Sequence, residues 1–171
     1  MLRKIRQKKI QSPGGTFAIV ASRYNARYVD AMLRAARAEL GRAGVSRIQM
    51  VRVPGAYEIP LAAKRLARAS RLGPNTPLSA IICLGVILRG ETVHAAHIGD
   101  TVSRALMEIQ LAHEIPVIHE VLLLENEAQA RVRCLGRKHN RGAEAAQTAL
   151  AMARVMAGLN TPSHSPSNTI I

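Results

Sequence analysis

Three short segments of the sequence carry residue types that can bind and transform a small organic molecule. Together they offer aromatic rings, a carboxylate, a hydroxyl and an imidazole, and two of them contain glycine. The segments are Arg23-Tyr24-Asn25, residues 54–58 (Pro-Gly-Ala-Tyr-Glu) and residues 89–94 (Arg-Gly-Glu-Thr-Val-His). A further imidazole, His119, lies later in the sequence. Each segment follows a short apolar run that is typical of a buried strand. Because ligands of parallel α/β sheets bind outside the carboxyl ends of the strands, we expect these segments to form one site.

The turn Gly90-Glu91-Thr92 precedes a helical pattern. Its backbone N–H groups and the helix dipole could hold a phosphate group, with the Thr92 hydroxyl as a further donor. The alternative is that Glu91 and Thr92 only cap the helix. The patterns GxxxxGKS/T and GxGxxG are missing, which excludes a Walker-type nucleotide loop.

His94 lies on the first turn of the same helical pattern. It is placed to exchange protons with a bound phosphate ester, because imidazole gains and loses a proton near neutral pH. The alternative is a solvated helix histidine. His94 and His97 could share a metal ion, but no third ligand is evident, so we expect no metal site.

Three further side chains each allow two interpretations, a binding role and a purely structural role. Tyr24 could stack on a flat heterocycle, Glu58 could accept hydrogen bonds from sugar-like hydroxyls, and Arg133 could grip a phosphate with its planar donor fork. The alternatives are a half-buried loop aromatic for Tyr24, a charge at a helix N-terminus for Glu58 and a solvated basic helix face for Arg133. Spacing alone does not choose between them.

The elements that must position these residues alternate along the chain. We expect strands at 16–22, 48–53, 80–88 and about 116–123, and helices at 26–43, 59–70, about 95–113, 125–135 and 142–159, with Gly44 stopping the first helix. Short right-handed crossovers then give an α/β fold with a four-stranded parallel sheet covered by helices on both faces. We expect one domain, residues 16–159, between a basic N-terminal extension, residues 1–15, and a disordered tail, residues 160–171.

The net charge and the cysteine content indicate which binding partners and which cellular compartment to expect. The 171 residues include 24 Lys and Arg against 11 Asp and Glu, a formal net charge of +13. Basic residues cluster in residues 1–9 and 131–141, and the others are spread over helical faces. This distribution favours a solvated surface over a groove that binds nucleic acid. The solitary Cys83 and Cys134 suit a reducing compartment. No apolar run approaches the roughly 20 residues that cross a bilayer, so we expect a cytoplasmic protein with no membrane partner.

Four motifs stand in register along the chain: Ser22-Arg23-Tyr24-Asn25, residues 53–60 (Val-Pro-Gly-Ala-Tyr-Glu-Ile-Pro), residues 84–94 (Leu-Gly-Val-Ile-Leu-Arg-Gly-Glu-Thr-Val-His) and residues 142–146 (Gly-Ala-Glu-Ala-Ala). Their order and spacing resemble the lumazine synthase family over about residues 16–159. The resemblance implies a flavodoxin-like three-layer sandwich. It also implies the penultimate step of riboflavin biosynthesis, in which 5-amino-6-(D-ribitylamino)uracil condenses with 3,4-dihydroxy-2-butanone 4-phosphate to 6,7-dimethyl-8-ribityllumazine and phosphate is released.

The resemblance assigns a role to each matching residue. Tyr24 takes the position of the ring-stacking aromatic, usually Phe, that packs on the pyrimidine. Ala56, Tyr57 and Glu58 match the segment that holds the ribityl chain and amine, and Val86, Ile87 and Leu88 match the strand end whose backbone contacts the pyrimidine. Glu91 and Thr92 match the phosphate-side turn, His94 matches the proton donor, and Arg133 matches the arginine that grips the phosphate. In the family, Arg133 and the residue matching His119 come from a neighbouring subunit.

The implied protein is therefore a transferase that works as a homo-oligomer with active sites between subunits. The family forms pentamers, sometimes combined into decamers or hollow icosahedral shells. The implied chemistry needs no cofactor and no metal. Besides the two substrates, riboflavin synthase is an implied partner.

Two positions depart from the family pattern. Phe-Asp commonly follows the catalytic histidine, but Ala95-Ala96 follows His94 here, and His119 replaces an aromatic that covers the pyrimidine. The first change removes a carboxylate that could orient His94. An alternative function follows, in which a catalytically weak pentameric or shell-forming protein of the same fold binds anionic cargo through its basic arm.

Overall fold

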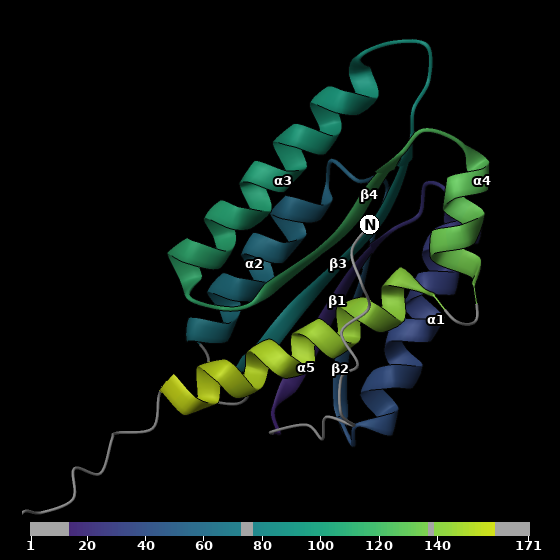
Figure 1. Ribbon diagram of the computed structural model, residues 1–171. Helices are drawn as coiled ribbons and strands as arrows, with labels where there is room; N and C mark the ends of the chain where they lie inside the picture. Colours follow the sequence, from purple (N-terminus) through teal and green to yellow (C-terminus); the bar gives the residue numbers. More distant parts are fainter. Residues whose placement is uncertain (1–13, 73–76, 137–138, 160–171) are drawn as a thin grey trace, which may run out of the picture.

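The computed structural model describes residues 14–72, 77–136 and 139–159. Its centre is a sheet of four parallel strands in the order β2-β1-β3-β4 (Figure 1), namely β1 (Thr16–Ser22), β2 (Arg47–Val53), β3 (Leu78–Leu88) and β4 (Val117–Leu124). β1 is buried along its whole length and β3 along all but its ends. Their continuous apolar sequences reflect this position, since helices on both faces of a parallel sheet leave neither face to water.

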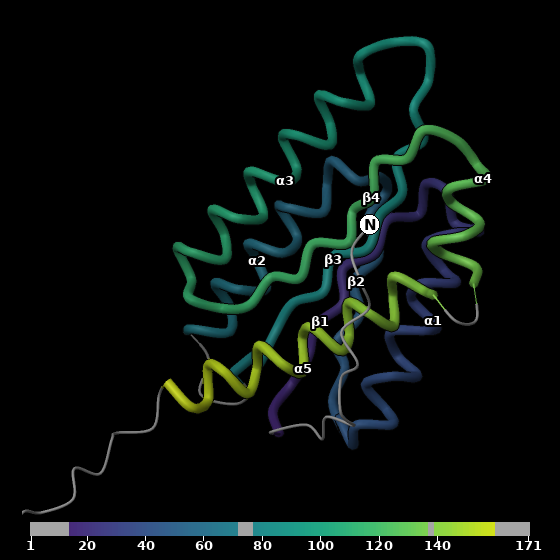
Figure 2. Tube along the Cα trace, viewed as in Figure 1, coloured from purple at the N-terminus to yellow at the C-terminus, as the bar shows by residue number. Residues whose placement is uncertain are grey.

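Helices cover both faces of the sheet (Figures 1 and 2). α2 (Ile59–Leu72) and α3 (His94–His113) pack on one face, and α1 (Ala26–Arg42) and α5 (Arg141–Leu159) pack on the other. α4 (Glu127–Ala130) and the π-helical turn η1 (Arg131–Leu135) lie beside α1. The molecule is thus a three-layer α/β sandwich with one apolar core on each side of the sheet, as the sequence predicts.

Small residues let α5 approach α1 closely. A Cβ atom on Gly142 would lie only 2.0 Å from the backbone oxygen of Met32, so this crossing requires glycine. Further along α5, Ala145, Ala146 and Ala149 are buried against the same core. Close helix packing is how a chain with only 2% aromatic residues fills its interior.

The observed boundaries agree with the sequence-based expectations to within two residues, and Gly44, with φ of 82°, follows the end of α1. The helix expected over 125–135 differs in kind, because α4 gives way to a π-helical turn at Arg131. This turn ends where Gly136 becomes extended and Asn140 Nδ2 donates to the Cys134 carbonyl at 2.5 Å. Periodicity alone does not separate these two kinds of helix.

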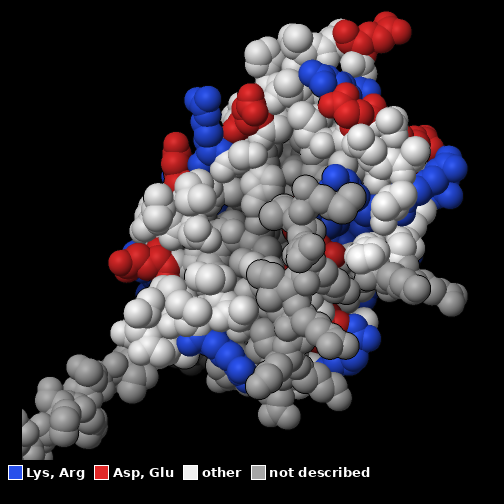
Figure 3. Space-filling view, viewed as in Figure 1, with Lys and Arg blue, Asp and Glu red and all other residues white. Residues whose placement is uncertain are grey.

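Two expectations concern the ends of the chain. The basic extension lies outside the described residues except for Gly14 and Gly15, and the tail of residues 160–171 lies wholly outside them. Within the described residues, no helix combines the length and the apolar character that crossing a membrane requires. On the face seen in Figure 3, the described Lys and Arg side chains are interspersed with Asp and Glu.

Candidate active site

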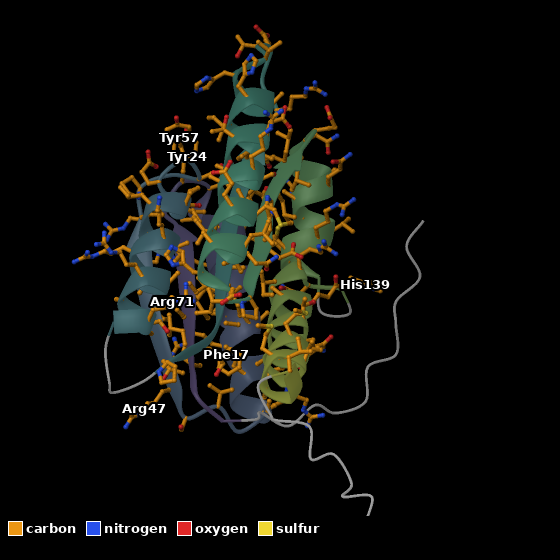
Figure 4. All side chains as sticks on the ribbon, turned by 90° about the vertical axis from the view of Figure 1, so that its left-hand side faces the viewer. Phe17, Tyr24, Arg47, Tyr57, Arg71 and His139 are labelled. Atoms are coloured by element: carbon orange, nitrogen blue, oxygen red, sulfur yellow. The ribbon has the colours of Figure 1, made fainter. Side chains whose placement is uncertain are left out.

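A cavity of about 960 Å³ lies at the carboxyl ends of the strands. The loops after β1, β2 and β3 and the first turns of α3 form its walls, and Figure 4 shows Tyr24 and Tyr57 together at this end of the molecule. Nine of the predicted site residues line it, namely Tyr24, Ala56, Tyr57, Glu58, Val86, Ile87, Leu88, Thr92 and His94. Parallel strands carry the three sequence segments to the same edge of the sheet, which is why they meet.

Backbone hydrogen bonds hold the Tyr24 loop against the neighbouring loop. Tyr24 N–H donates to the Pro54 carbonyl oxygen at 2.9 Å, and Arg23 N–H donates to the Val53 carbonyl oxygen at 2.8 Å. The Tyr24 side chain is 73% exposed and lines the cavity, so its ring has a free face for a planar ligand.

Asn25 is a cavity residue to which we assigned no role from the sequence. Its backbone is left-handed, with φ of 55°, and its side-chain Nδ2 donates to the Val86 carbonyl oxygen at 2.8 Å. This hydrogen bond joins the loop after β1 to the end of β3. The signal was available, because asparagine directly before a helical pattern is one of the few residues that adopts this conformation readily.

Glu58 has a structural partner as well as a place in the cavity. Its Oε2 accepts the Gly55 N–H at 2.8 Å, which closes the turn that starts α2. Glu58 also directly precedes α2, where the simpler alternative expects a negative charge favoured by the helix dipole. The side chain remains exposed and lines the cavity beside Tyr57, which is 60% exposed. The two roles of Glu58 are therefore compatible.

The start of α3 shapes the opposite wall. Val93 is the cap residue, and no side chain makes a capping hydrogen bond there, so neither Glu91 nor Thr92 has the capping role considered above. The helix instead presents His94, His97, Ile98 and Thr101 along one face of the cavity. The sequence motifs indicate no role for Ile98 or Thr101 and only a rejected metal-ligand role for His97, although their spacing from His94 is the helical repeat that identifies them.

Glu91, His119 and Arg133 do not line the cavity, although the structure describes all three. His119 lies on β4, with its Nε2 2.8 Å from Ser103 Oγ on α3. Its Nδ1 accepts the Val121 N–H at 3.3 Å, and Ser103 donates to the Gly99 carbonyl oxygen, so Nε2 carries the proton. Partial burial lowers the pKa of His119, which favours the neutral ring. Arg133 lies on η1, in the layer of α1 and α5.

The described residues provide this cavity with neither a cluster of metal ligands nor an accessible thiol. Among the described residues, no group of three or more His, Cys, Asp or Glu side chains could hold a metal ion. Both cysteines are free and buried. Burial raises the pKa of Cys134 to about 11 and that of Cys83 further, so neither thiol is a ready nucleophile. The cavity thus brings an imidazole, an aromatic ring and the backbone of a strand end to one space.

Comparison with known proteins yields a consistent set of relatives. The family model for 6,7-dimethyl-8-ribityllumazine synthase matches residues 14–157. The protein of that name from Xanthomonas oryzae pv. oryzae (strain PXO99A) is 40% identical over 149 residues, which are 86% of this chain and 93% of that protein. The protein of the same name from Xanthomonas euvesicatoria pv. vesicatoria (strain 85-10) is 41% identical over 82% of this chain and 88% of that protein. A third, from Stenotrophomonas maltophilia (strain R551-3), is 40% identical over the same shares.

Proposed function

Because the chain belongs to the 6,7-dimethyl-8-ribityllumazine synthase family, transferases of riboflavin biosynthesis, we propose that its cavity condenses 5-amino-6-(D-ribitylamino)uracil with 3,4-dihydroxy-2-butanone 4-phosphate. The products are 6,7-dimethyl-8-ribityllumazine, inorganic phosphate and water. The observation that carries the proposal is the cavity itself, in which an aromatic ring, a strand end and the histidine of a helix start face one space large enough for both substrates.

In this proposal the pyrimidine lies against Tyr24. The backbone of Val86, Ile87 and Leu88 contacts its ring atoms, and the exposure of the Tyr24 side chain supports a stacking role. Ala56, Tyr57 and Glu58 hold the ribityl chain and the amine. The Gly55–Glu58 hydrogen bond keeps this segment in one conformation, so that fewer conformations are lost when the substrate binds.

The keto-phosphate occupies the other side, near the start of α3. Thr92 lies in the cavity wall there, and the first turn of a 20-residue helix carries a partial positive charge that favours a phosphate group. His94 transfers the proton, and Glu91 belongs to the same turn. Arg133, together with His119, reaches the site from a neighbouring subunit of a pentamer. The location of both residues away from the cavity of their own chain supports this arrangement.

The reaction then proceeds without a cofactor. An amine of the pyrimidine attacks the ketone carbon, and loss of water gives an imine. Loss of the proton from the neighbouring hydroxyl-bearing carbon expels phosphate, which carries away the electron pair of the broken C–O bond, and the resulting enol rearranges to a ketone. The second amine attacks this ketone and closes the ring with loss of a further water. Most of the rate enhancement comes from holding the two substrates together, with His94 contributing a factor of roughly 10² or less.

Two features of the setting complete the proposal. The reaction takes place in the cytoplasm, where a reducing environment suits the free thiols of Cys83 and Cys134. Its product passes to riboflavin synthase, the partner that consumes it.

The test is an absorbance assay of lumazine formation from both substrates, run beside a protein-free control because the condensation proceeds unaided. We expect an acceleration that falls when His94 or Arg133 is replaced by alanine. An assembled wild-type protein that gives only the spontaneous rate contradicts the proposal.

That negative result would support the second candidate, a catalytically weak assembly that binds anionic cargo through its basic N-terminal arm. Ala95 and Ala96 favour this candidate, since neither offers a carboxylate to orient His94. It predicts that deleting residues 1–9 abolishes retention of an anionic polymer, whereas the enzyme proposal predicts that the deletion leaves lumazine formation unchanged.

A further inference from the structure

A buried carboxylate on β4 is paired with the arginine that begins α5. Glu120 is on β4 and is only 7% exposed. Its Oε2 accepts a hydrogen bond of 3.1 Å from Nε of Arg141, at the start of α5, while Nη1 of Arg141 donates to Glu144 at 2.8 Å. The guanidinium of Arg141 therefore bridges the buried carboxylate of Glu120 and the more exposed carboxylate of Glu144. Figure 4 places His139, two residues before Arg141, away from Tyr24 and Tyr57.

The charged neighbours of Glu120 come from two elements. α5 contributes Arg141 and Glu144, and η1 contributes Arg133 and the Cys134 thiol. β3 places the apolar Leu84 in register with Glu120, and α3 packs on the opposite face of the sheet. Burial raises the pKa of Glu120 to about 7, against the opposing effect of Arg141 and Arg133. Glu120 consequently changes charge near neutrality.

We propose that Glu120 is a proton-controlled regulator of anion binding by Arg133 and Arg141, the two arginines whose charges act on it. The proposal rests on the phosphate-binding role of Arg133 in the proposed function. When Glu120 is ionised, the carboxylates of Glu120 and Glu144 balance the two guanidinium groups. When Glu120 takes up a proton, one positive charge is no longer balanced. The affinity for the phosphate group of the substrate then increases as the pH falls through neutrality.

The geometry explains why Glu120 and not Glu144 has this role. The Glu120 side chain is 9% exposed and that of Glu144 is 31% exposed, so water screens Glu144 far better. The charge of Glu120 acts through a less polar medium on Arg141 and Arg133. Binding and protonation are linked, so an anion that binds better when Glu120 is protonated must also raise the proton affinity of Glu120.

Binding of inorganic sulfate to the full-length oligomer tests the proposal without the enzymatic reaction. Sulfate keeps its double charge between about pH 6 and about pH 8, whereas phosphate titrates in that range. We expect wild-type affinity to fall roughly fivefold or more over this interval. Glu120→Gln should bind sulfate at about pH 8 as tightly as the wild type binds it at about pH 6, with little dependence on pH.

Two further variants serve as controls. Glu144→Gln removes the outer carboxylate and should keep the dependence on pH, because Glu120 is still present. Arg133→Met should lose the pH-dependent component of binding. If Glu120→Gln retains the wild-type slope, the proposal is wrong, and a group other than Glu120 causes the dependence on pH.

A second measurement needs no variant that must fold. Calorimetry of sulfate binding in two buffers of different ionisation enthalpy counts the protons taken up by the wild-type protein. We expect net uptake that is greatest near pH 7. Absence of uptake overturns the proposal. If the protein formed no lumazine, sulfate binding with this dependence on pH would still establish the role of Glu120, so the two failures are distinguishable.

Discussion

The side-chain amide of Asn25 donates a hydrogen bond of 2.8 Å to the carbonyl oxygen of Val86. The two residues are 61 positions apart, and both line the cavity. The bond holds the loop that carries Tyr24 at a set distance from the strand end proposed to contact the pyrimidine. The left-handed backbone of Asn25 is therefore part of how the pyrimidine side of the cavity is built.

Replacing Asn25 separates the hydrogen bond from the backbone conformation. Asn25→Gly loses the bond but accepts φ of 55°, and we expect a loss of about 1 kcal/mol in the free energy of unfolding. Asn25→Ala loses the bond and also places alanine in a left-handed backbone conformation that is unfavourable for it, so the free energy of unfolding should fall by about 2–3 kcal/mol. Denaturant unfolding measures both. KM for the pyrimidine should rise in each variant, and an unchanged KM in both would show that the bond does not position Tyr24.

His94→Ala tests the proposed proton transfer. We expect kcat to fall by roughly tenfold to a hundredfold, with little change in KM for the pyrimidine, because the imidazole acts on the proton and not on ring binding. His97→Ala is the matched control, since His97 lines the same cavity one turn further along α3. Equal losses in both variants would assign the effect to the shape of the wall and not to His94.

Mixed oligomers test whether Arg133 serves a neighbouring subunit. His94→Ala and Arg133→Ala should each be impaired, the second mainly through a higher KM for the keto-phosphate. Co-refolding the two variants creates some sites with His94 from one subunit and Arg133 from another, so activity should exceed that of either variant alone. If each subunit used its own Arg133, mixing would restore nothing.

Gly142 tests the close approach of α5 to α1. Its Cβ would lie 2.0 Å from Met32 O, so Gly142→Ala must move the helices apart, and we expect a loss of at least about 2 kcal/mol in unfolding free energy. Gly158→Ala, in the same helix, meets no atom within 4 Å and should be neutral or more stable by up to about 1 kcal/mol. A thermal melt of each variant distinguishes the two, and similar Tm values would contradict the crossing.

The free energy of unfolding should depend on pH through Glu120. Its carboxyl has a pKa of about 7 in the folded protein, above its ordinary value of 4.5. Between these values the folded state binds more protons than the unfolded state, so the contribution of Glu120 to stability is largest below 4.5 and is lost as the pH rises through 7. The full difference is at most roughly 3 kcal/mol. Comparing wild type with Glu120→Gln from about pH 5 to about pH 8 isolates it, and parallel profiles would show that Glu120 keeps an ordinary pKa.

The sequence alone was sufficient for the fold and for the edge of the sheet where ligands bind. Alternation of apolar strands with amphipathic helices leaves few topologies, and a parallel sheet brings the ends of its strands together. Tyr24, the segment Ala56–Glu58 and His94 follow strands directly, so their place at that edge is set by chain order. Even His97 and Thr101 could have been found, because the helical repeat from His94 reaches them.

Other features depend on contacts between residues far apart in the chain. Glu120 looks like one of two polar residues in an otherwise apolar strand, and only the packing of α5 on β4 brings Arg141 to its buried carboxylate. Asn25 and Val86 meet only because β1 and β3 pair in the sheet. Local periodicity determines the helices and strands, and the order of the chain then determines which residues follow each strand at the edge of the sheet. Tertiary packing sets desolvation and charge pairing, which depend on what lies across each face and are not encoded in any local pattern.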